Sequence, residues 1–232
     1  MSYYLGLSIL SDSDKIKKEQ SSAEARRILS HFEKRNIDTN DISFEARGRP
    51  FFLEKETDFN ISHSNNIVAV SYINKKDIRV GCDIEKIKPR PMMEKIARDK
   101  FTESENKYLN SNQFFNYENF YKLWTLKESY IKLRGLSIFD ITKIPSFIKE
   151  NKITNSFEFS FCADEKKPIY FRIYEISNTN RYTEIKNNHF FLAEAIEGEN
   201  YQSEIIWFSP SSLTLDCKMI LEIKNAMLPG SC

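Results

Sequence analysis

Apolar side chains recur at every second position in several short segments, a spacing that is typical of strands with one buried face. The first such segment runs from Tyr3 to Ile9 and predicts an opening strand. Segments rich in β-branched and aromatic residues predict further strands at 67–73, 78–84, 157–162, 169–176, 190–196 and 204–208. The polar stretch 74–77 favours a hairpin between the strands predicted over 67–73 and 78–84.

Helical spacing appears in three other segments. Ser21 or Ser22 is suited to cap a helix over 23–35, and further helices are predicted over 92–110 and 117–133. The pattern of residues 213–232 predicts no single element. Each half of the chain therefore offers a helix and several strands, which predicts an α+β fold and raises the hypothesis of an internal duplication, although no strict sequence repeat supports it.

Composition narrows the classes of function. The 34 Lys and Arg residues balance 33 Asp and Glu residues, so no overall field favours binding to nucleic acid or to an anionic membrane. No apolar run is long enough to cross a bilayer, and the acidic residues that follow Leu10 argue against a secretory signal. The four cysteines are widely scattered, which favours a reduced, cytoplasmic protein without a zinc or redox motif.

Two carboxylates lie close together on the strand predicted over 78–84 and just beyond it. Asp83 and Glu85 are two residues apart, so both side chains project from one face of an extended chain. Such a pair repels unless a cation lies between the two groups, and carboxylate oxygens suit Mg²⁺. The alternative is an exposed strand end with solvated acids. Cys82 and Ile84 would face the opposite way, towards a core.

A second group of candidate residues lies on the helix predicted over 117–133. Trp124, Glu128 and Lys132 are spaced at i, i+4 and i+8, so they fall along one line of the helix surface. The helix can therefore present a carboxylate and an ammonium group to the same site. The alternative is an ordinary Glu–Lys helix pair with the tryptophan packed in the core.

Two basic side chains occupy polar segments nearer the N-terminus. His63 lies among small polar residues and is able to hydrogen-bond a phosphate oxygen, or instead to orient a loop. Arg49 lies in a Gly-Arg-Pro turn, where an arginine is either a ligand contact or simply solvated. Neither residue by itself indicates which function applies.

Taken together and in this order, these segments resemble the 4'-phosphopantetheinyl transferases of the surfactin-synthetase-activating (Sfp) type. The resemblance rests on four blocks: R-G-R-P at Arg47–Pro50, F-N-I-S-H-S at Phe59–Ser64, V-G-C-D-I-E-K-I-K-P at Val80–Pro89 and W-T-L-K-E-S-Y-I-K at Trp124–Lys132. The last two blocks are the most specific, and similarity is clear from about residue 44 to residue 135. The resemblance implies a pseudo-twofold duplicated α+β monomer with two intimately packed halves, 1–95 and 96–232, and an active site in the cleft between them.

The resemblance also implies roles for individual residues. Asp83, Glu85 and Glu128 would hold Mg²⁺, or Mn²⁺ in its place, on the pyrophosphate of coenzyme A. Further cofactor contacts are implied for Arg49, Ser62, His63, Lys127 and Lys132, and catalytic roles for Glu128, Glu105 and Lys132. Glu105 stands where the family carries an acid suggested as the base for the incoming serine.

One departure from the family pattern concerns the 3'-phosphate of coenzyme A. Family members carry basic residues just ahead of the first helix, whereas this chain reads Gln-Ser-Ser-Ala at 20–23. Lys17, Lys18, Arg26 and Arg27 are the basic residues nearby that could substitute.

The implied activity is transfer of 4'-phosphopantetheine from coenzyme A to a serine of an apo acyl or peptidyl carrier protein, with release of 3',5'-ADP. Carriers of this kind serve nonribosomal peptide or polyketide biosynthesis, and the aromatic residues Phe114, Phe115 and Tyr117 are candidates for contacting them. Two alternatives stay open: a non-catalytic homologue that binds coenzyme A and carrier proteins, and another Mg²⁺-dependent transferase or hydrolase of nucleotide phosphates.

Overall fold

The computed structural model describes residues 3–10, 17–54, 56–112, 114–154, 156–178, 189–208 and 215–224 of the chain. In chain order the elements are β1 (Tyr3–Ile9), α1 (Lys18–Glu33), β2 (Ile42–Phe44), β3 (Pro50–Phe52), β4 (Asp58–Ser64), β5 (Ile67–Ile73), β6 (Val80–Lys86), α2 (Met93–Lys100), α3 (Glu103–Leu109), α4 (Tyr117–Arg134), the 3₁₀ helix η1 (Ile138–Lys143), β7 (Ile148–Asn151), β8 (Ser156–Phe159), β9 (Ile169–Asn178), β10 (His189–Glu197), β11 (Glu204–Trp207) and β12 (Leu215–Lys224).

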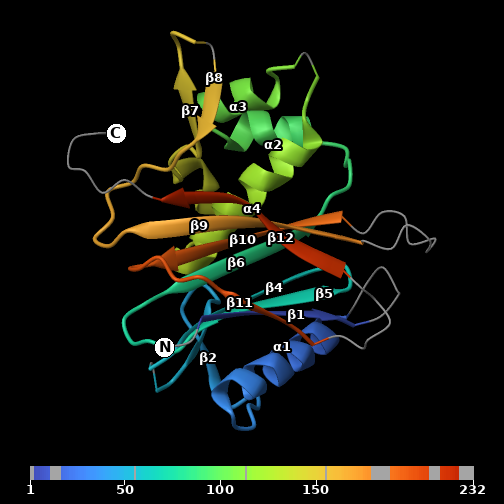
Figure 1. The fold of residues 1–232 in the computed structure, drawn as a ribbon, viewed down its shortest axis with the longest axis vertical. Coiled ribbons are helices and arrows are strands. Elements are labelled where there is room, and N and C mark those ends of the chain that lie inside the picture. Colours follow the sequence, from blue (N-terminus) through green and yellow to red (C-terminus); the bar gives the residue numbers. More distant parts are fainter. Residues whose placement is uncertain are drawn as a thin grey trace.

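Two four-stranded sheets lie between helices in a layered arrangement (Figure 1). The first sheet has the strand order β11-β1-β5-β4, and the second has the order β12-β9-β10-β6. Helix α1 packs on the outer face of the first sheet through its apolar side chains, which include Ile28 and Leu29. Helix α4 packs on the second sheet, and α2 and α3 pack against α4. The predicted α+β class is therefore confirmed.

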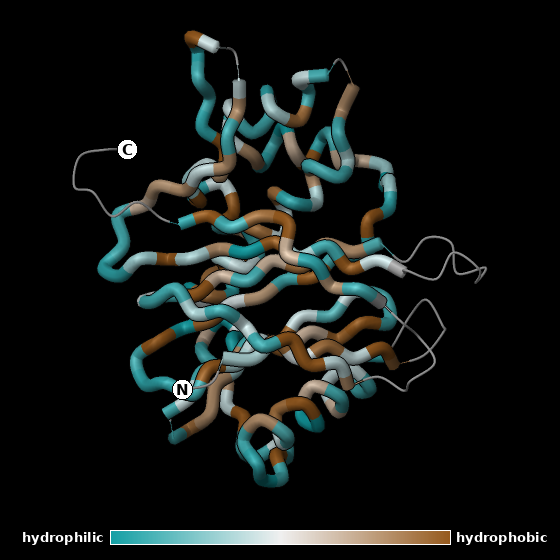
Figure 2. Tube along the Cα trace, in the orientation of Figure 1, coloured by the Kyte–Doolittle hydropathy of each residue, from teal (hydrophilic) through white to brown (hydrophobic). Residues whose placement is uncertain are grey.

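A third apolar layer joins the two sheets. Leu5 and Leu7 of β1 pack in one cluster with Phe190 and Leu192 of β10, and all four side chains are fully buried. Hydrophobic residues recur along the strands of both sheets, while the turns at their ends are mostly hydrophilic (Figure 2). Because burial of apolar area is the main favourable contribution to folding, this layer holds the two sheets together as one unit.

Helix α4 is delimited by its own end residues and lies unusually close to β6. The side chain of Asn116 accepts a hydrogen bond from the backbone N–H of Asn119 at the N-terminus, and Gly135 ends the helix in the left-handed conformation. A Cβ atom added at Gly81 of β6 would lie only 2.2 Å from the carbonyl oxygen of Ser129. The glycine therefore allows the helix to rest directly on the strand that carries Asp83 and Glu85.

The structure confirms several predicted elements and corrects others. The opening strand, β5 and α4 lie where the pattern placed them, but the hairpin over 67–84 is wrong. Strand β5 pairs with β1 and β4, whereas β6 pairs with β10 in the other sheet. The helix predicted over 92–110 is two helices, because Thr102 caps the N-terminus of α3.

The two sheets do not follow the predicted division of the chain between residues 95 and 96. Each sheet takes strands from both sides of the boundary between residues 95 and 96, since β6 joins the second sheet and β11 the first. The region 213–232 contains β12, and its remaining residues lie outside the described part.

Cys162 is disulfide-bonded, contrary to the expectation of reduced thiols, while Cys82 and Cys217 are free. Among the described helices none is long and apolar enough to span a membrane.

Candidate active site

Carboxylates from β6 and α4 meet where the helix crosses the strand. Asp83 and Glu85 project from the face of β6 that α4 covers, and Glu128 and Lys132 lie one turn apart on that helix. The ammonium group of Lys132 lies 2.7 Å from Oδ1 of Asp83. The structure thus brings the two most specific sequence blocks together, and we call Asp83, Glu85, Glu128 and Lys132 the acidic cluster.

Burial and the negative charge of Asp83 raise the pKa of two carboxylates of the acidic cluster, Glu128 and Glu85. Burial, followed by the negative charge of Asp83, raises the pKa of Glu128 to about 7, while the positive charge of Lys132 opposes the shift. Burial and then Asp83 also raise the pKa of Glu85. One ammonium group therefore does not neutralise three neighbouring acids, and a bound cation would remove the remaining repulsion.

The possible metal-binding atoms of the acidic cluster are carboxylate oxygens. Oδ2 of Asp83 is buried and accepts no hydrogen bond, although buried polar atoms normally have a partner. Hard carboxylate oxygens are the ligands that Mg²⁺ and Mn²⁺ prefer. Within the described residues, no three His, Cys, Asp or Glu side chains already form a metal centre. The residues therefore fit a divalent cation by charge and chemistry, and the carboxylates would have to draw closer on binding it.

Two serines of β4 hold the carboxylates of β6. The hydroxyl of Ser62 donates to Oδ1 of Asp83 at 2.9 Å and accepts from the ammonium of Lys132 at 2.9 Å. The hydroxyl of Ser64 donates to Oε2 of Glu85 at 3.3 Å. Sequence reasoning selected Ser62 but missed Ser64. The signal for Ser64 was its position two residues further along a strand, which places both hydroxyls on one face.

His63 lies on the opposite face of β4 and is exposed. Partial burial, followed by the charge of Lys132, lowers the pKa of His63, and Lys18 at the start of α1 contributes in the same direction. The imidazole is therefore neutral at physiological pH and able to donate one hydrogen bond. Lys18 lies near enough to His63 for its positive charge to lower the pKa of the imidazole. It is one of the four basic residues that could substitute for the missing family contact with the 3'-phosphate.

Glu105 and Lys127 do not join the acidic cluster. They form an ion pair with Nζ and Oε2 3.1 Å apart, and both side chains are fully enclosed. The lysine ammonium makes no hydrogen bond of good geometry and lies 5.4 Å from the ring centre of Phe101. Burial lowers the pKa of Lys127. Glu105 also accepts the backbone N–H groups of Thr102 and Phe147, so its carboxylate is already fully used within the protein.

Arg49 is likewise committed to contacts within the chain. Its guanidinium makes five hydrogen bonds, to the Asp58 carboxylate and to the backbone carbonyls of Pro50, Val80 and Lys132. A guanidinium has five N–H donors, so none is left for a ligand. The hydrogen bond to the Lys132 carbonyl instead places the positive charge of Arg49 at the C-terminus of α4, where it interacts favourably with the helix dipole.

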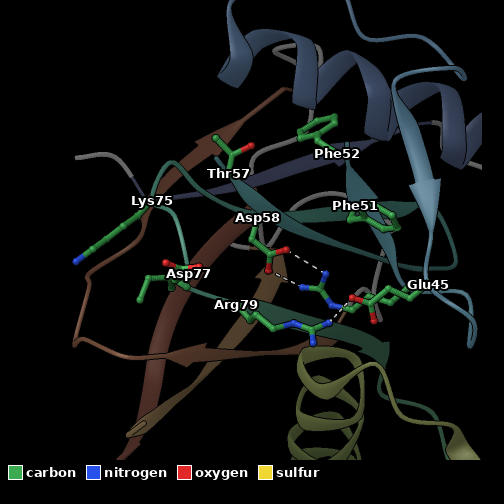
Figure 3. Close-up of a pocket in the computed structure, with 10 residues that line it drawn as sticks. Glu45, Phe51, Phe52, Thr57, Asp58, Lys75, Asp77 and Arg79 are labelled. Atoms are coloured by element: carbon green, nitrogen blue, oxygen red, sulfur yellow. Dashed lines mark hydrogen bonds and ion pairs between the residues drawn. The ribbon is translucent and has the colours of Figure 1, made fainter. Parts of the chain in front are cut away.

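The pocket beside Arg49 is lined by charged groups, most of which already have partners (Figure 3). The Arg79 guanidinium binds Glu45 at 2.8 Å, as the figure shows, and Lys75 binds Glu199 at 2.7 Å. Because these charges are paired, the pocket offers no concentrated field of either sign. The acidic cluster is the stronger candidate for catalysis.

The region of the chain that matches known proteins includes the acidic cluster. Residues 79–189, which include the acidic cluster, match the model of the 4'-phosphopantetheinyl transferase superfamily. The chain is 33% identical over 159 residues to the 4'-phosphopantetheinyl transferase gsp of Aneurinibacillus migulanus, which covers 66% of this chain and 64% of that protein. It is 29% identical over 145 residues to the 4'-phosphopantetheinyl transferase Sfp of Bacillus subtilis, covering 60% and 61%.

A shorter relative gives the same result. The chain is 32% identical over 108 residues to the 4'-phosphopantetheinyl transferase AcpT of Escherichia coli K12, covering 46% of this chain and 54% of that protein. The matches span about half to two thirds of the length of these curated relatives. Over the region that carries the acidic cluster, the chain thus has the sequence features of the 4'-phosphopantetheinyl transferase superfamily.

Proposed function

We propose that this protein transfers the 4'-phosphopantetheine group of coenzyme A to a serine of an apo acyl or peptidyl carrier protein, releasing 3',5'-ADP. The observation that carries the proposal is the meeting of Asp83, Glu85 and Glu128 beside Lys132, within the region that matches the transferase superfamily. Three neighbouring acids and one ammonium suit a pyrophosphate bound together with a divalent cation.

The reaction is a displacement at phosphorus. The serine hydroxyl attacks the β-phosphate of coenzyme A, its oxygen forms the new P–O bond, and the bond to the departing 3',5'-ADP breaks. Negative charge spreads over the phosphoryl oxygens and the leaving group, so positioning and electrostatic stabilisation supply most of the catalysis. A Mg²⁺ ion held by the three acids would stabilise this charge when bound.

The chain's own residues have separate tasks in this proposal. Lys132 holds Asp83 in place and contributes a positive charge towards the phosphate oxygens. The neutral His63 and the Lys18 ammonium would contact the cofactor's phosphates on the far side of β4. Glu128 is the carboxylate placed to accept the serine proton, because Glu105 is enclosed in its ion pair with Lys127.

We also propose that the protein is a transferase of the Sfp type and that its fold is a duplication of two similar halves. The layer order of helix, sheet, sheet and helix supports two similar halves, because each half supplies three strands of one four-stranded sheet, one strand of the other sheet, and the helix that packs on the sheet it mainly forms. The exposed ring of Phe114, next to a hollow lined by Ile87, Phe115 and Tyr117, supports carrier docking near the loop before α4. We expect a cytoplasmic monomer that acts on carriers of peptide or polyketide assembly.

The deciding experiment incubates the protein with coenzyme A, Mg²⁺ and a panel of apo carrier proteins and follows the carrier mass. A mass gain of one phosphopantetheine supports the proposal. Binding of coenzyme A without a mass gain would instead indicate a non-catalytic homologue, and hydrolysis of nucleotide without carrier modification would indicate another phosphoryl transferase or hydrolase. Asp83→Ala should abolish transfer in a folded protein, whereas Glu158→Ala, on the exposed β8 strand, should leave it unchanged.

A further inference from the structure

Strands β4 and β6 are edge strands of different sheets, yet they are joined by a regular set of hydrogen bonds. Four side chains at alternate positions of β4 each accept the backbone N–H of one β6 residue, and every pair is separated by 22 residues. The pairs are Asp58 with Val80 at 2.8 Å, Asn60 with Cys82 at 3.1 Å, Ser62 with Ile84 at 3.2 Å and Ser64 with Lys86 at 3.0 Å. We call this set the side-chain ladder.

The ladder satisfies the outer edge of β6. On its other edge β6 pairs with β10, so the N–H groups of alternate residues face away from that partner. Buried N–H groups need an acceptor, and here side-chain oxygens take the place of a neighbouring strand. The polar side chains on β4 are themselves buried or half-buried, with Asn60 only 2% exposed.

The ladder also fixes the direction of the acidic side chains. Residues at alternate positions of a strand face opposite sides, so anchoring the N–H groups of Cys82 and Ile84 against β4 directs Asp83 and Glu85 towards α4. Two of the four acceptors, Ser62 and Ser64, touch those carboxylates directly. Asn60 makes no hydrogen bond to them, and its amide oxygen accepts only from Cys82, through the backbone N–H at 3.1 Å and the thiol at 3.9 Å.

We propose that Asn60 is a positioning residue for the acidic cluster: by holding the N–H of Cys82 it fixes β6 against β4 and so aims Asp83 and Glu85 at α4. This inference deepens the proposed function and rests on it for the role of the metal. Residues that orient metal ligands without touching the metal typically change metal affinity by about 10- to 100-fold when removed.

The test compares Asn60→Ala with two matched variants in the full chain. Asn60→Ser restores an oxygen acceptor, since serine hydroxyls already serve this purpose at the next two positions of the ladder. Ser71→Ala removes a fully buried hydroxyl on β5, directly opposite Asn60 in the strand register, whose side chain binds Tyr3 and Glu194 rather than β6. Thermal unfolding of all variants identifies a temperature at which each is folded.

Two measurements are made on the folded proteins. Calorimetric titration with Mn²⁺ alone should show an affinity about 10-fold weaker in Asn60→Ala, an affinity near that of the wild type in Asn60→Ser, and no change in Ser71→Ala. Amide hydrogen exchange should show lost protection at Cys82 and Ile84 in Asn60→Ala only. The second measurement needs neither a metal nor a substrate.

The outcomes are distinguishable. Unchanged Mn²⁺ affinity in a folded Asn60→Ala variant, or unchanged protection of the Cys82 amide, overturns the positioning role. An equal loss of affinity in Ser71→Ala also overturns it, because the effect would then follow any buried polar loss in this region. If the wild type binds no Mn²⁺, the proposed metal site is refuted, and the exchange measurement alone decides whether Asn60 orders β6.

Discussion

Glu128 should make the metal-free protein less stable as the pH rises, and Glu128→Gln should remove that effect. Burial and the charges of Asp83 and Glu85 raise the pKa of Glu128 to about 7 from its ordinary value of 4.5. The folded state therefore binds this proton more tightly than the unfolded state does. The resulting stability is fully present below pH 4.5 and is lost as the pH rises through 7.

The size of this effect follows from the shift. A pKa raised from 4.5 to about 7 corresponds to at most about 3.5 kcal/mol, since each pKa unit is about 1.4 kcal/mol. Glu128 is partly exposed, and screening by solvent reduces the expected difference to about 1–2 kcal/mol. Glutamine has nearly the same size and no charge, so the variant should be more stable than the wild type by this amount at pH 8 and equally stable near pH 4.

The assay is urea unfolding in EDTA at pH 4, pH 6 and pH 8 for the wild type and Glu128→Gln. Titrating groups outside the acidic cluster contribute equally to both proteins, so the difference between the two free energies of unfolding reports Glu128 and its coupling to the other charges of the cluster. Adding Mg²⁺ at pH 8 should stabilise the wild type more than the variant. If the difference in free energy of unfolding does not change with pH, the repulsion within the acidic cluster is refuted. The variant Glu158→Gln, on the exposed hairpin, is the control for loss of a surface charge.

Three further predictions test other parts of the structure. Lys132→Ala should raise the KM for coenzyme A and lower kcat, because it removes a phosphate-facing cation and frees Asp83; unchanged steady-state kinetics would contradict this role. Lys127→Met should lower the free energy of unfolding by about 3–5 kcal/mol, measured by urea unfolding, because Glu105 would be left buried and unpaired; a loss below about 1 kcal/mol would argue against an enclosed pair. Gly81→Ala should weaken Mn²⁺ binding and lower the melting temperature, because its Cβ atom would collide with the α4 backbone; a melting temperature equal to that of the wild type would show that the helix does not rest on β6.

Local periodicity explains why much of the candidate site could be read from the sequence. Asp83 and Glu85 share a face because strand side chains alternate, and Glu128 and Lys132 share a face because four residues make about one helical turn. The helix over 117–133 was equally readable, since its apolar spacing and its end signals agree with each other. These features depend only on neighbours in the chain.

Pairing between distant segments could not be read in the same way. The residues 67–73 and 78–84 have the pattern of a hairpin, but β6 pairs with β10, more than 100 residues away, and only the three-dimensional packing chooses between these partners. The strand character of 58–64 was also missed, because its alternate polar residues serve the edge of another sheet instead of solvent.

Burial separates the residues that the sequence suggested as ligands into those at the acidic cluster and those enclosed in contacts with other parts of the chain. Arg49, Glu105 and Lys127 belong to the blocks that resemble the family or lie near them, and their residue types suit phosphate or proton chemistry. The structure encloses all three in contacts with other parts of the chain. Whether a charged side chain meets a ligand or an internal partner depends on what packs around it, and sequence spacing carries no such information.

The sequence by itself determined which of the candidate residues share a strand face or a helix face, because these relations follow from the fixed geometry of each element. The tertiary structure decided that the strand lies under the helix, that β4 supplies the ladder, and which charges stay free. Those outcomes depend on contacts between residues far apart in the chain, and each contact forms only when the two sheets and their helices pack together.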